Sequence, residues 1–362
     1  MPGHDLIVIG GSAGATEALQ KIVGGLPAEF PAAVLVTVHT APTGPGLLAD
    51  ILDRCGPLRA QRAKDGEPIV RGRIYVAPPD FHLLVDHRHI RLFHGPRENG
   101  FRPAIDPLFR SAAGAAGPRT VGVVLSGGLD DGTEGLMIIK RHHGTAIVQD
   151  PADAQTPSMP QNAIDHCNVD RILPAAQIAA ALVELAHSAA PEAPAIKDDA
   201  PDVAEVGEAA LRFGRPADDA NAFTCPECGG ALPEVSEGKL RRFQCHVGHR
   251  YSEHTLLAAQ NDAVESALWA GVRALEEAAA LRRRLARGSD ARWPRIVQEY
   301  ERQAKEAEHR AAILRGVVLE TQNGKARGAV EPPRDVTPHA SSPNGSGRVK
   351  RKGKRTAASK RG

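Results

Sequence analysis

Several things are scarce in this sequence, and each absence narrows what the protein can be. Aromatic residues make up 4% of the 362 residues, so the core must consist mainly of Val, Leu, Ile and Ala. The formal net charge is +2, which gives no overall case for nucleic-acid binding. The chain has no apolar run of about 18 residues and no signal peptide. We therefore expect a soluble, cytoplasmic protein without membrane insertion.

Cysteine is also scarce, and the five that occur form two groups. Cys55 and Cys167 stand alone, and we expect them to be buried thiols. The other three lie close together in the C-terminal half of the chain, at spacings typical of a metal site.

The first 190 residues alternate short β-rich runs with helical patterns. Near-continuous apolar strands separated by helices predict an α/β fold with a doubly wound, mainly parallel sheet and helices on both faces. The alternation from His82 to Phe93 predicts an inserted β-hairpin. The expected strands are Leu6–Ile9, Val34–Val38, Arg73–Ala77, Thr120–Leu125, Thr145–Val148 and Val169–Leu173. The expected helices lie near 15–25, 44–54, 104–115, 132–142 and 175–188.

The composition changes after this domain. Helical periodicity in the last third predicts two antiparallel helices, with Leu257 and Val264 on the apolar face of the first. The tail carries many basic residues. The main interpretation is a solvated, disordered segment, and the alternative is weak attraction to nucleic acid. The expected segments are an α/β domain (1–190), a linker (191–221), a cysteine module (222–252), a helical hairpin (253–320) and a disordered basic tail (321–362).

A glycine-rich turn follows the first expected strand. The segment Gly10-Gly11-Ser12-Ala13-Gly14 fits the G-x-S-x-G pattern of a nucleophile elbow, in which a sharp turn exposes the serine hydroxyl. A turn of this kind also cradles phosphates, so the pattern alone leaves both interpretations open. Neither a Walker lysine nor a ribose-binding acid follows at the usual spacing, which weakens the phosphate interpretation.

A nucleophilic serine needs a base and an orienting carboxylate. His39 follows the second expected strand, and Asp131 follows the strand that ends at Leu125. Because functional groups collect beyond the carboxyl ends of parallel strands, we expect these side chains and Ser12 at one edge of the sheet. The alternatives are that His39 is a structural donor and that Asp131 caps the next helix.

These residues belong to a set of separated blocks that resembles the catalytic domain of the chemotaxis methylesterase family, CheB. The resemblance implies Ser12 as nucleophile, His39 as general base and Asp131 as the carboxylate behind it. The blocks are Ile7–Gly14, Val38-His39, Ile74–Pro79, Arg102–Phe109, Val124–Gly127 with Asp131-Gly132, and Val148–Asp150 with Met159-Pro160.

The resemblance also implies an activity and partners. Family members hydrolyse glutamyl methyl esters on chemoreceptor helices, with deamidation of receptor glutamines as a second reaction. We expect methylated receptor or signalling helices as partners, and no cofactor for catalysis. The oxyanion is expected at backbone N–H groups near Ala13, Gly127 and Gly128. Arg102 and Met159, with Phe101, are the expected residues of an open substrate groove.

The chain departs from the family pattern at several positions. Ala13 replaces the usual threonine, and Ser126-Gly127-Gly128-Leu129 replaces the usual T-G-M-G loop. Family members commonly begin with a receiver domain, which this sequence does not contain. We therefore expect control from a separate response regulator, from the C-terminal part, or not at all.

The cysteine cluster predicts a small zinc-ribbon-like module. Cys225 and Cys228 form a C-x2-C pair, and Cys245 with His249 closes the site after sixteen intervening residues. Three thiolates and an imidazole suit structural, tetrahedral zinc, with His246 as the alternative fourth ligand. About 30 residues hold too little core to fold unaided, which favours a structural metal.

Three functions remain open on the sequence. The first is a serine esterase acting on methylated glutamates, and the second is a deamidase on the same scaffold, since both reactions need the same triad. The third is a weakly catalytic scaffold that recruits partners through its C-terminal module.

Overall fold

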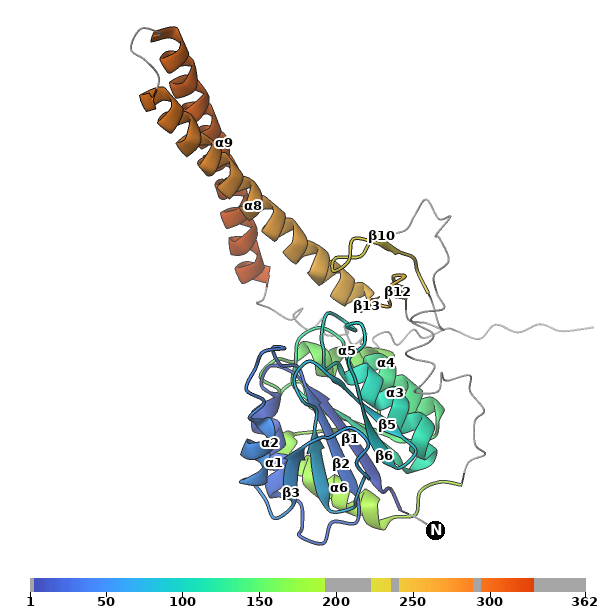
Figure 1. Ribbon diagram of the computed structural model, residues 1–362. Helices are drawn as coiled ribbons and strands as arrows, with labels where there is room; N and C mark the ends of the chain where they lie inside the picture. Colours follow the sequence, from blue (N-terminus) through green and yellow to red (C-terminus); the bar gives the residue numbers. More distant parts are fainter. Residues whose placement is uncertain (1–2, 193–222, 236–240, 289–293, 329–362) are drawn as a thin grey trace, which may run out of the picture. The chain divides into compact units, whose positions relative to one another are not determined.

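The computed structural model describes residues 3–192, 223–235, 241–288 and 294–328 of the chain (Figure 1). The chain divides into two compact units, Met1–Ser266 and Ala267–Gly362. Nearly all of the predicted linker and the tail beyond Gly328 lie outside the described residues.

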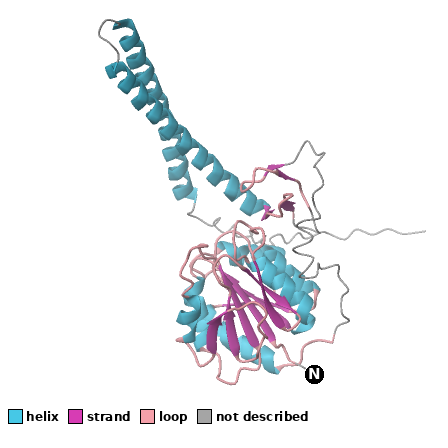
Figure 2. Cartoon of the chain, in the orientation of Figure 1, coloured by secondary structure: helices cyan, strands magenta, loops and turns pink. Residues whose placement is uncertain are grey.

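A parallel sheet of seven strands is the centre of the first unit, and it confirms the predicted fold class. Its order is β3-β4-β2-β1-β7-β8-β9, and Figure 2 shows these strands side by side. All six residues of β1 are buried, as an apolar strand in the middle of a covered sheet requires. The strands are β1 (Leu6–Gly11), β2 (Ala33–Val38), β3 (Arg59–Arg62), β4 (Arg73–Val76), β7 (Thr120–Val124), β8 (Thr145–Gln149) and β9 (Arg171–Leu173).

Helices cover both faces of this sheet because side chains alternate along each strand. In β1, Ile7 and Ile9 point to one face and Leu6 and Val8 to the other. The helices on the first face are α1 (Ala15–Gly24), α2 (Leu48–Asp53) and α6 (Ala175–His187). Those on the second face are α3 (Ile105–Ala116), α4 (Thr133–Arg141) and α5 (Ser158–His166).

The predicted hairpin is present and packs on the second face. Its strands β5 (His82–Asp86) and β6 (His89–Phe93) pair in antiparallel register, and β5 lies against α3. A strand and an α-helix of this domain were not predicted. The edge strand β3 reads Arg-Ala-Gln-Arg and carries no apolar pattern. The helix α5 has Pro160 in its first turn and mixed polarity, so its periodicity is weak.

The cysteine module consists of two short antiparallel ribbons. In the first, β10 (Phe223–Thr224) pairs with β11 (Ala231–Leu232), and in the second, β12 (Arg242–Gln244) pairs with β13 (Arg250–Ser252). A small apolar cluster that includes Leu232, Phe243 and Tyr251 fills the space between them. This core is small, as the length of the module predicts.

Two long helices follow, α8 (Glu253–Gly288) and α9 (Pro294–Gly328). The tail was expected to begin at 321, but α9 continues to Gly328, so that boundary was wrong. Closely packed alanines, among them Ala279, Ala304 and Ala307, bring the two helices together.

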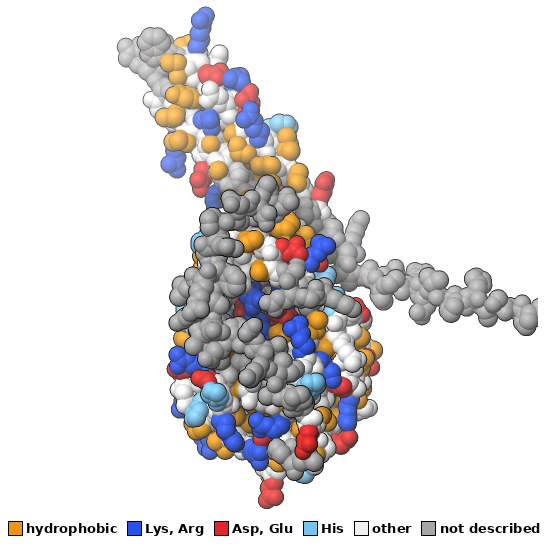
Figure 3. Space-filling view, turned by 90° about the vertical axis from the view of Figure 1, so that its right-hand side faces the viewer, with side chains coloured by type: hydrophobic (Ala, Val, Ile, Leu, Met, Phe, Trp, Pro, Cys, Tyr) orange, Lys and Arg blue, Asp and Glu red, His pale blue; other side chains and the backbone are white. Residues whose placement is uncertain are grey.

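Only some of the residues expected on the buried, apolar face of α8 are in fact buried. Leu257 and Val264 are exposed, whereas Leu256 and Val272 are buried. Figure 3 shows hydrophobic side chains interspersed with charged ones along the surface of these helices. No helix in the described part of the chain is long and apolar enough to cross a membrane.

Candidate active site and metal centre

Ser12 lies at the carboxyl end of β1, where the chain turns sharply into α1. Its backbone N–H donates to the carbonyl of Ser126 at 2.9 Å, and its carbonyl accepts from the N–H of Ala15 at 3.1 Å. Gly14 has φ +79°, and a Cβ there would lie 2.6 Å from the Cβ of Gln155. Only glycine fits such a turn, which explains the G-x-S-x-G pattern and leaves Ser12 at the sheet edge.

His39 follows β2, the neighbour of β1. Gly11 and Val38 are paired in the parallel register, so Ser12 and His39 come next on adjacent strands about 4.8 Å apart. The Nε2 atom of His39 lies 2.6 Å from Oδ2 of Asp131 in a hydrogen bond. Its Nδ1 atom is buried and has no hydrogen-bond partner among the described residues. The ring therefore has one nitrogen held by a carboxylate and the other open to accept a proton.

The aromatic ring of Phe101 covers the imidazole of His39. The two rings are stacked, with centroids 3.7 Å apart and an angle of 9° between their planes. Together with the Asp131 hydrogen bond, this contact leaves the imidazole little freedom to rotate. Phe101, expected at the substrate groove, thus lies against the proposed base.

Asp131 is fully buried at the end of the loop that leads into α4. Besides His39, its oxygens accept from the side-chain amide of Asn99 at 2.9 Å and the backbone N–H of Ile105 at 2.7 Å. Burial alone would raise the pKa of Asp131, but the hydrogen bond and charge of His39, with the other two donors, hold it well below its usual range. The carboxylate is therefore ionised across the physiological pH range.

The loop 126–129 lies against Ser12. One of the oxyanion donors predicted in it, Gly127, is already hydrogen-bonded. The N–H of Gly127 donates to the carbonyl of Thr156 at 3.0 Å, so it is not free to bind an oxyanion. Among the described residues, the N–H groups of Ala13 and Gly128 donate to no backbone acceptor. They are the remaining candidate donors from the predicted set.

The predicted groove residues have different surroundings. Met159 is fully buried beneath Gly127, so it offers no surface to a substrate and that prediction needs correcting. Arg102 is mostly buried and donates to Oδ1 of Asp80 at 2.6 and 3.0 Å, which makes it a support of the loop. A hollow of about 320 Å³ opens beside the end of β2, but His39 is not among the residues that line it. It is lined by residues that include Val38, Thr40, Leu47, Ala77 and Pro79.

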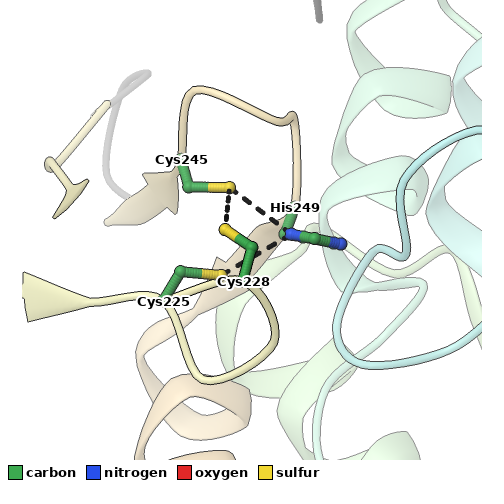
Figure 4. Close-up of side chains that lie close together, drawn as sticks. All are labelled: Cys225, Cys228, Cys245 and His249. Atoms are coloured by element: carbon green, nitrogen blue, oxygen red, sulfur yellow. Dashed lines mark hydrogen bonds between the residues drawn. The ribbon is translucent and has the colours of Figure 1, made fainter. Parts of the chain in front are cut away.

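The predicted metal ligands come together in the cysteine module (Figure 4). One atom from each of Cys225, Cys228, Cys245 and His249 lies within 4.8 Å of the other three. The sulfurs of Cys228 and Cys245 are 3.6 Å apart, and Nδ1 of His249 is 3.5 Å from the sulfur of Cys245. His246 is exposed and does not belong to this group.

These separations suit a tetrahedral ion. Zinc bonds of about 2.3 Å to sulfur and 2.0 Å to nitrogen place neighbouring ligands about 3.5 to 3.8 Å apart. Nε2 of His249 also lies 3.3 Å from a carboxylate oxygen of Glu227, so the nitrogen facing away from the sulfurs has an orienting partner. Gly229 directly follows Cys228, and Gly248 directly precedes His249. Their φ angles of +72° and +102° allow tight turns beside these ligands.

Two residues that sequence reasoning missed link this module to the active site. Asn99 contacts Asp131 on one side and the module on the other, and Arg242 of β12 contacts buried carboxylates of α3 and α4. Neither position carries a local motif. The only available signal was an asparagine two residues before Phe101, next to one of the blocks that resemble the family.

Comparison with known proteins identifies the first half of the chain. Residues 7–182 match the family model described as CheB methylesterase. A Leptospira interrogans protein named "putative protein-glutamate methylesterase/protein-glutamine glutaminase" is 36% identical over 183 residues, 50% of this chain and 95% of that protein. A protein-glutamate methylesterase/protein-glutamine glutaminase 2 of Anaeromyxobacter dehalogenans is 39% identical over 181 residues, 50% of this chain and 53% of that protein. The crystal structure of the Thermotoga maritima CheB methylesterase catalytic domain is 34% identical, covering 51% of this chain and all of that one, with a TM-score of 0.49.

Proposed function

Because the chain belongs to the CheB methylesterase family and is thus a carboxylic ester hydrolase, we propose that it removes methyl esters from glutamate side chains of chemoreceptor-type signalling proteins. The reaction consumes water and releases methanol and a free carboxylate. The observation that carries the proposal is the imidazole of His39 beside the end of β1. Asp131 holds one of its nitrogens, and the other has no hydrogen-bond partner in the described part of the chain.

In this mechanism Ser12 attacks the ester carbonyl while Nδ1 of His39 takes the hydroxyl proton. Asp131, ionised behind the ring, stabilises the imidazolium that forms. The N–H groups of Ala13 and Gly128 are the proposed donors to the oxyanion. His39 then returns the proton to the leaving methanol, and a water activated by the same nitrogen hydrolyses the acyl-enzyme.

The substrate is proposed to be a receptor helix that lies across the edge of the sheet. The hollow beside the end of β2 has a mostly apolar lining, and Leu47 in that lining is exposed. An apolar side chain of the helix can occupy this hollow while the methylated glutamate reaches Ser12. A separate response regulator as a further partner is also a proposal.

The decisive test is methanol release from methylated receptor fragments. We expect Ser12→Ala to abolish release while the folded state is retained, because only the hydroxyl is lost. Ser188→Ala is the matched control, since that hydroxyl caps α6 and donates to Leu185. Undiminished methanol release by Ser12→Ala would rule out the proposed nucleophile.

Glutamine deamidation is a second candidate, since the relatives' names give both activities. Amide and ester hydrolysis need the same triad, so ammonia release from receptor fragments with glutamine at the same sites measures it. A protein that acts only as a scaffold would release neither methanol nor ammonia.

We further propose that the cysteine module binds structural zinc and that the chain is organised as a catalytic domain, a linker, the module, a helical hairpin and a basic tail. Zinc would supply a cross-link that replaces an apolar core, and no catalytic step uses it. All five cysteines are free, which fits a reducing, cytoplasmic setting. We expect about one equivalent of zinc by elemental analysis, lost in Cys225→Ser and kept in His246→Ala. A folded module without metal would contradict this proposal.

A further inference from the structure

We propose that the cysteine module positions the catalytic triad: its metal-braced strands hold Asn99, and Asn99 holds Asp131 against His39. The inference rests on the proposed function, because it concerns the regulation of that same site. It makes the esterase activity depend on metal that is bound outside the active site. The module and the catalytic residues belong to the same compact unit, Met1–Ser266.

Asn99 is the link between the two parts. It is buried, and its side-chain nitrogen donates to Oδ1 of Asp131 at 2.9 Å and to Oδ2 of Asp106 at 3.0 Å. Its side-chain oxygen faces the module, where it accepts from the N–H of Ser252 and the hydroxyl of Thr255, both at 3.2 Å. Both ends of one amide are thus satisfied, one by the triad and one by the module. Loss of the module contacts would free the amide to rotate away from Asp131.

The backbone around Asn99 is also held by the module. Its N–H donates to the carbonyl of Arg250 at 2.8 Å, and the N–H of Arg250 donates to the carbonyl of Arg97 at 3.3 Å. Asn99 has φ +54°, a left-handed conformation that asparagine tolerates better than most residues, and these contacts hold the turn in place. The same turn carries Phe101, whose ring is stacked on His39.

The start of α8 contacts the loop that holds Asp131. Ser252 and Thr255 cap the helix reciprocally, with each side-chain oxygen accepting the N–H of the other residue at 3.1 and 2.8 Å. The hydroxyl of Ser252 also donates to Oδ1 of Asp130 at 2.7 Å. The module therefore contacts Asp130, which precedes Asp131 in the chain, and Asn99, which donates a hydrogen bond to Asp131.

Arg242 supplies a second, electrostatic connection. It is buried and pairs with Glu134 at 2.6 Å and Asp106 at 3.4 Å. Within the catalytic domain, Arg110 of α3 pairs with Glu98 at 2.7 Å and with Glu134 at 3.2 Å. Burial and the nearby charge of Asp131 raise the pKa of Asp106 to about 8, and Arg242 opposes that shift. The catalytic domain thus contains a buried acidic cluster, and its Glu134 carboxylate pairs with a cation from the module.

The metal ligands brace the strands that make these contacts. Cys245 follows β12 directly, and His249 precedes β13 directly. The N–H of Cys245 donates to the carbonyl of His249 at 3.1 Å, which closes the ribbon. An ion joining both side chains would fix the relative position of Arg242 and Arg250, which reach the catalytic domain. Loss of the ion would loosen this ribbon and, through Asn99, the orientation of Asp131.

The test uses the full-length, metal-loaded protein and two matched arginine variants. Arg242→Met removes the buried cation, whereas Arg241→Met removes its exposed neighbour. Three quantities are measured: kcat and KM for methanol release, metal content, and the low-field proton NMR signal of the His39–Asp131 hydrogen bond. We expect Arg242→Met to lower kcat by about 10- to 100-fold with KM nearly unchanged and to shift or broaden the low-field signal. Arg241→Met should behave as the unmodified protein does.

Thr255→Val provides a milder variant in case Arg242→Met does not fold. It keeps the shape of the side chain and removes the hydroxyl, which donates to Asn99 and accepts from the N–H of Ser252. A smaller fall in kcat and a shifted signal are expected. Chelation of the metal in the unmodified protein should alter the same signal, and added Zn²⁺ should restore it. An unchanged signal and kcat in Thr255→Val and after metal removal would overturn the inference. Because the signal needs no substrate, absence of methanol release with a metal-dependent signal would count against the proposed function alone.

Discussion

Gly127→Ala should impair catalysis because a methyl group at this position collides with the nucleophile. The added Cβ would lie 2.7 and 2.8 Å from the terminal atoms of Met159 and 3.0 Å from the Cβ of Ser12. Favourable carbon contacts lie at about 3.5 to 4.0 Å, so one neighbour must move by roughly 1 Å. Met159 is fully buried and cannot swing out, so part of the displacement falls on Ser12.

The effect of such a displacement on the reaction rate can be worked out. A shift of about 1 Å in a reacting group costs on the order of 100-fold in rate, equivalent to about 2.7 kcal/mol of activation free energy. Overpacking of the buried methionine should also lower the free energy of unfolding by about 1 to 3 kcal/mol.

The matched control for this change is a glycine outside the site. Gly114 in α3 is exposed and has no heavy atom within 4 Å of the position that a Cβ would occupy, so Gly114→Ala should keep full activity. Methanol release and thermal unfolding are measured for both variants. Equal activity of Gly127→Ala and Gly114→Ala would refute the close packing of this loop against Ser12.

Three further predictions follow from the site and the helices. Asp131→Asn should lower kcat by about 10⁴-fold in the methanol assay, because the amide no longer stabilises the imidazolium. The pKa of Asp131 is depressed on folding, so its contribution to stability is present above about pH 4, its unfolded-state pKa, and is lost as the pH falls toward the folded value. The stability difference between the unmodified protein and Asp131→Asn should therefore shrink in denaturant titrations below pH 4, and a constant difference would contradict the assignment. Gly316→Ala should raise the unfolding free energy of the helical hairpin by about 1 kcal/mol, measured by circular dichroism, since nothing lies within 4 Å of the new methyl group.

The sequence was a good guide where local pattern and strand topology suffice. The apolar runs around Leu6–Ile9 and Val34–Val38 predicted parallel neighbours, and β1 and β2 pair in that way. Because parallel strands end at one edge, the positions of Ser12 and His39 at the ends of these runs already predicted that they lie close together.

Prediction was weaker where tertiary packing decides. The strand β3 carries no apolar alternation, since it lies at the edge of the sheet and is held by pairing with β4. In α8 the period of 3.6 residues allowed Leu257 on the buried face, but the contacts with the module bury Leu256 instead. Met159 illustrates the same limit, because whether a methionine near an active site is exposed or lies beneath it depends on packing from other elements.

By itself, the sequence determined the chemistry that the two sites can hold: a serine in a glycine turn, a histidine and an aspartate at strand ends, and three cysteines with a histidine at metal-ligand spacing. Those features are local, or follow from the rule that parallel strands share an edge. Only the tertiary structure decided that the two sites are joined. Asn99 lies between Asp131 and the module because contacts between residues 153 positions apart in the chain place it there, and no local pattern encodes such a contact.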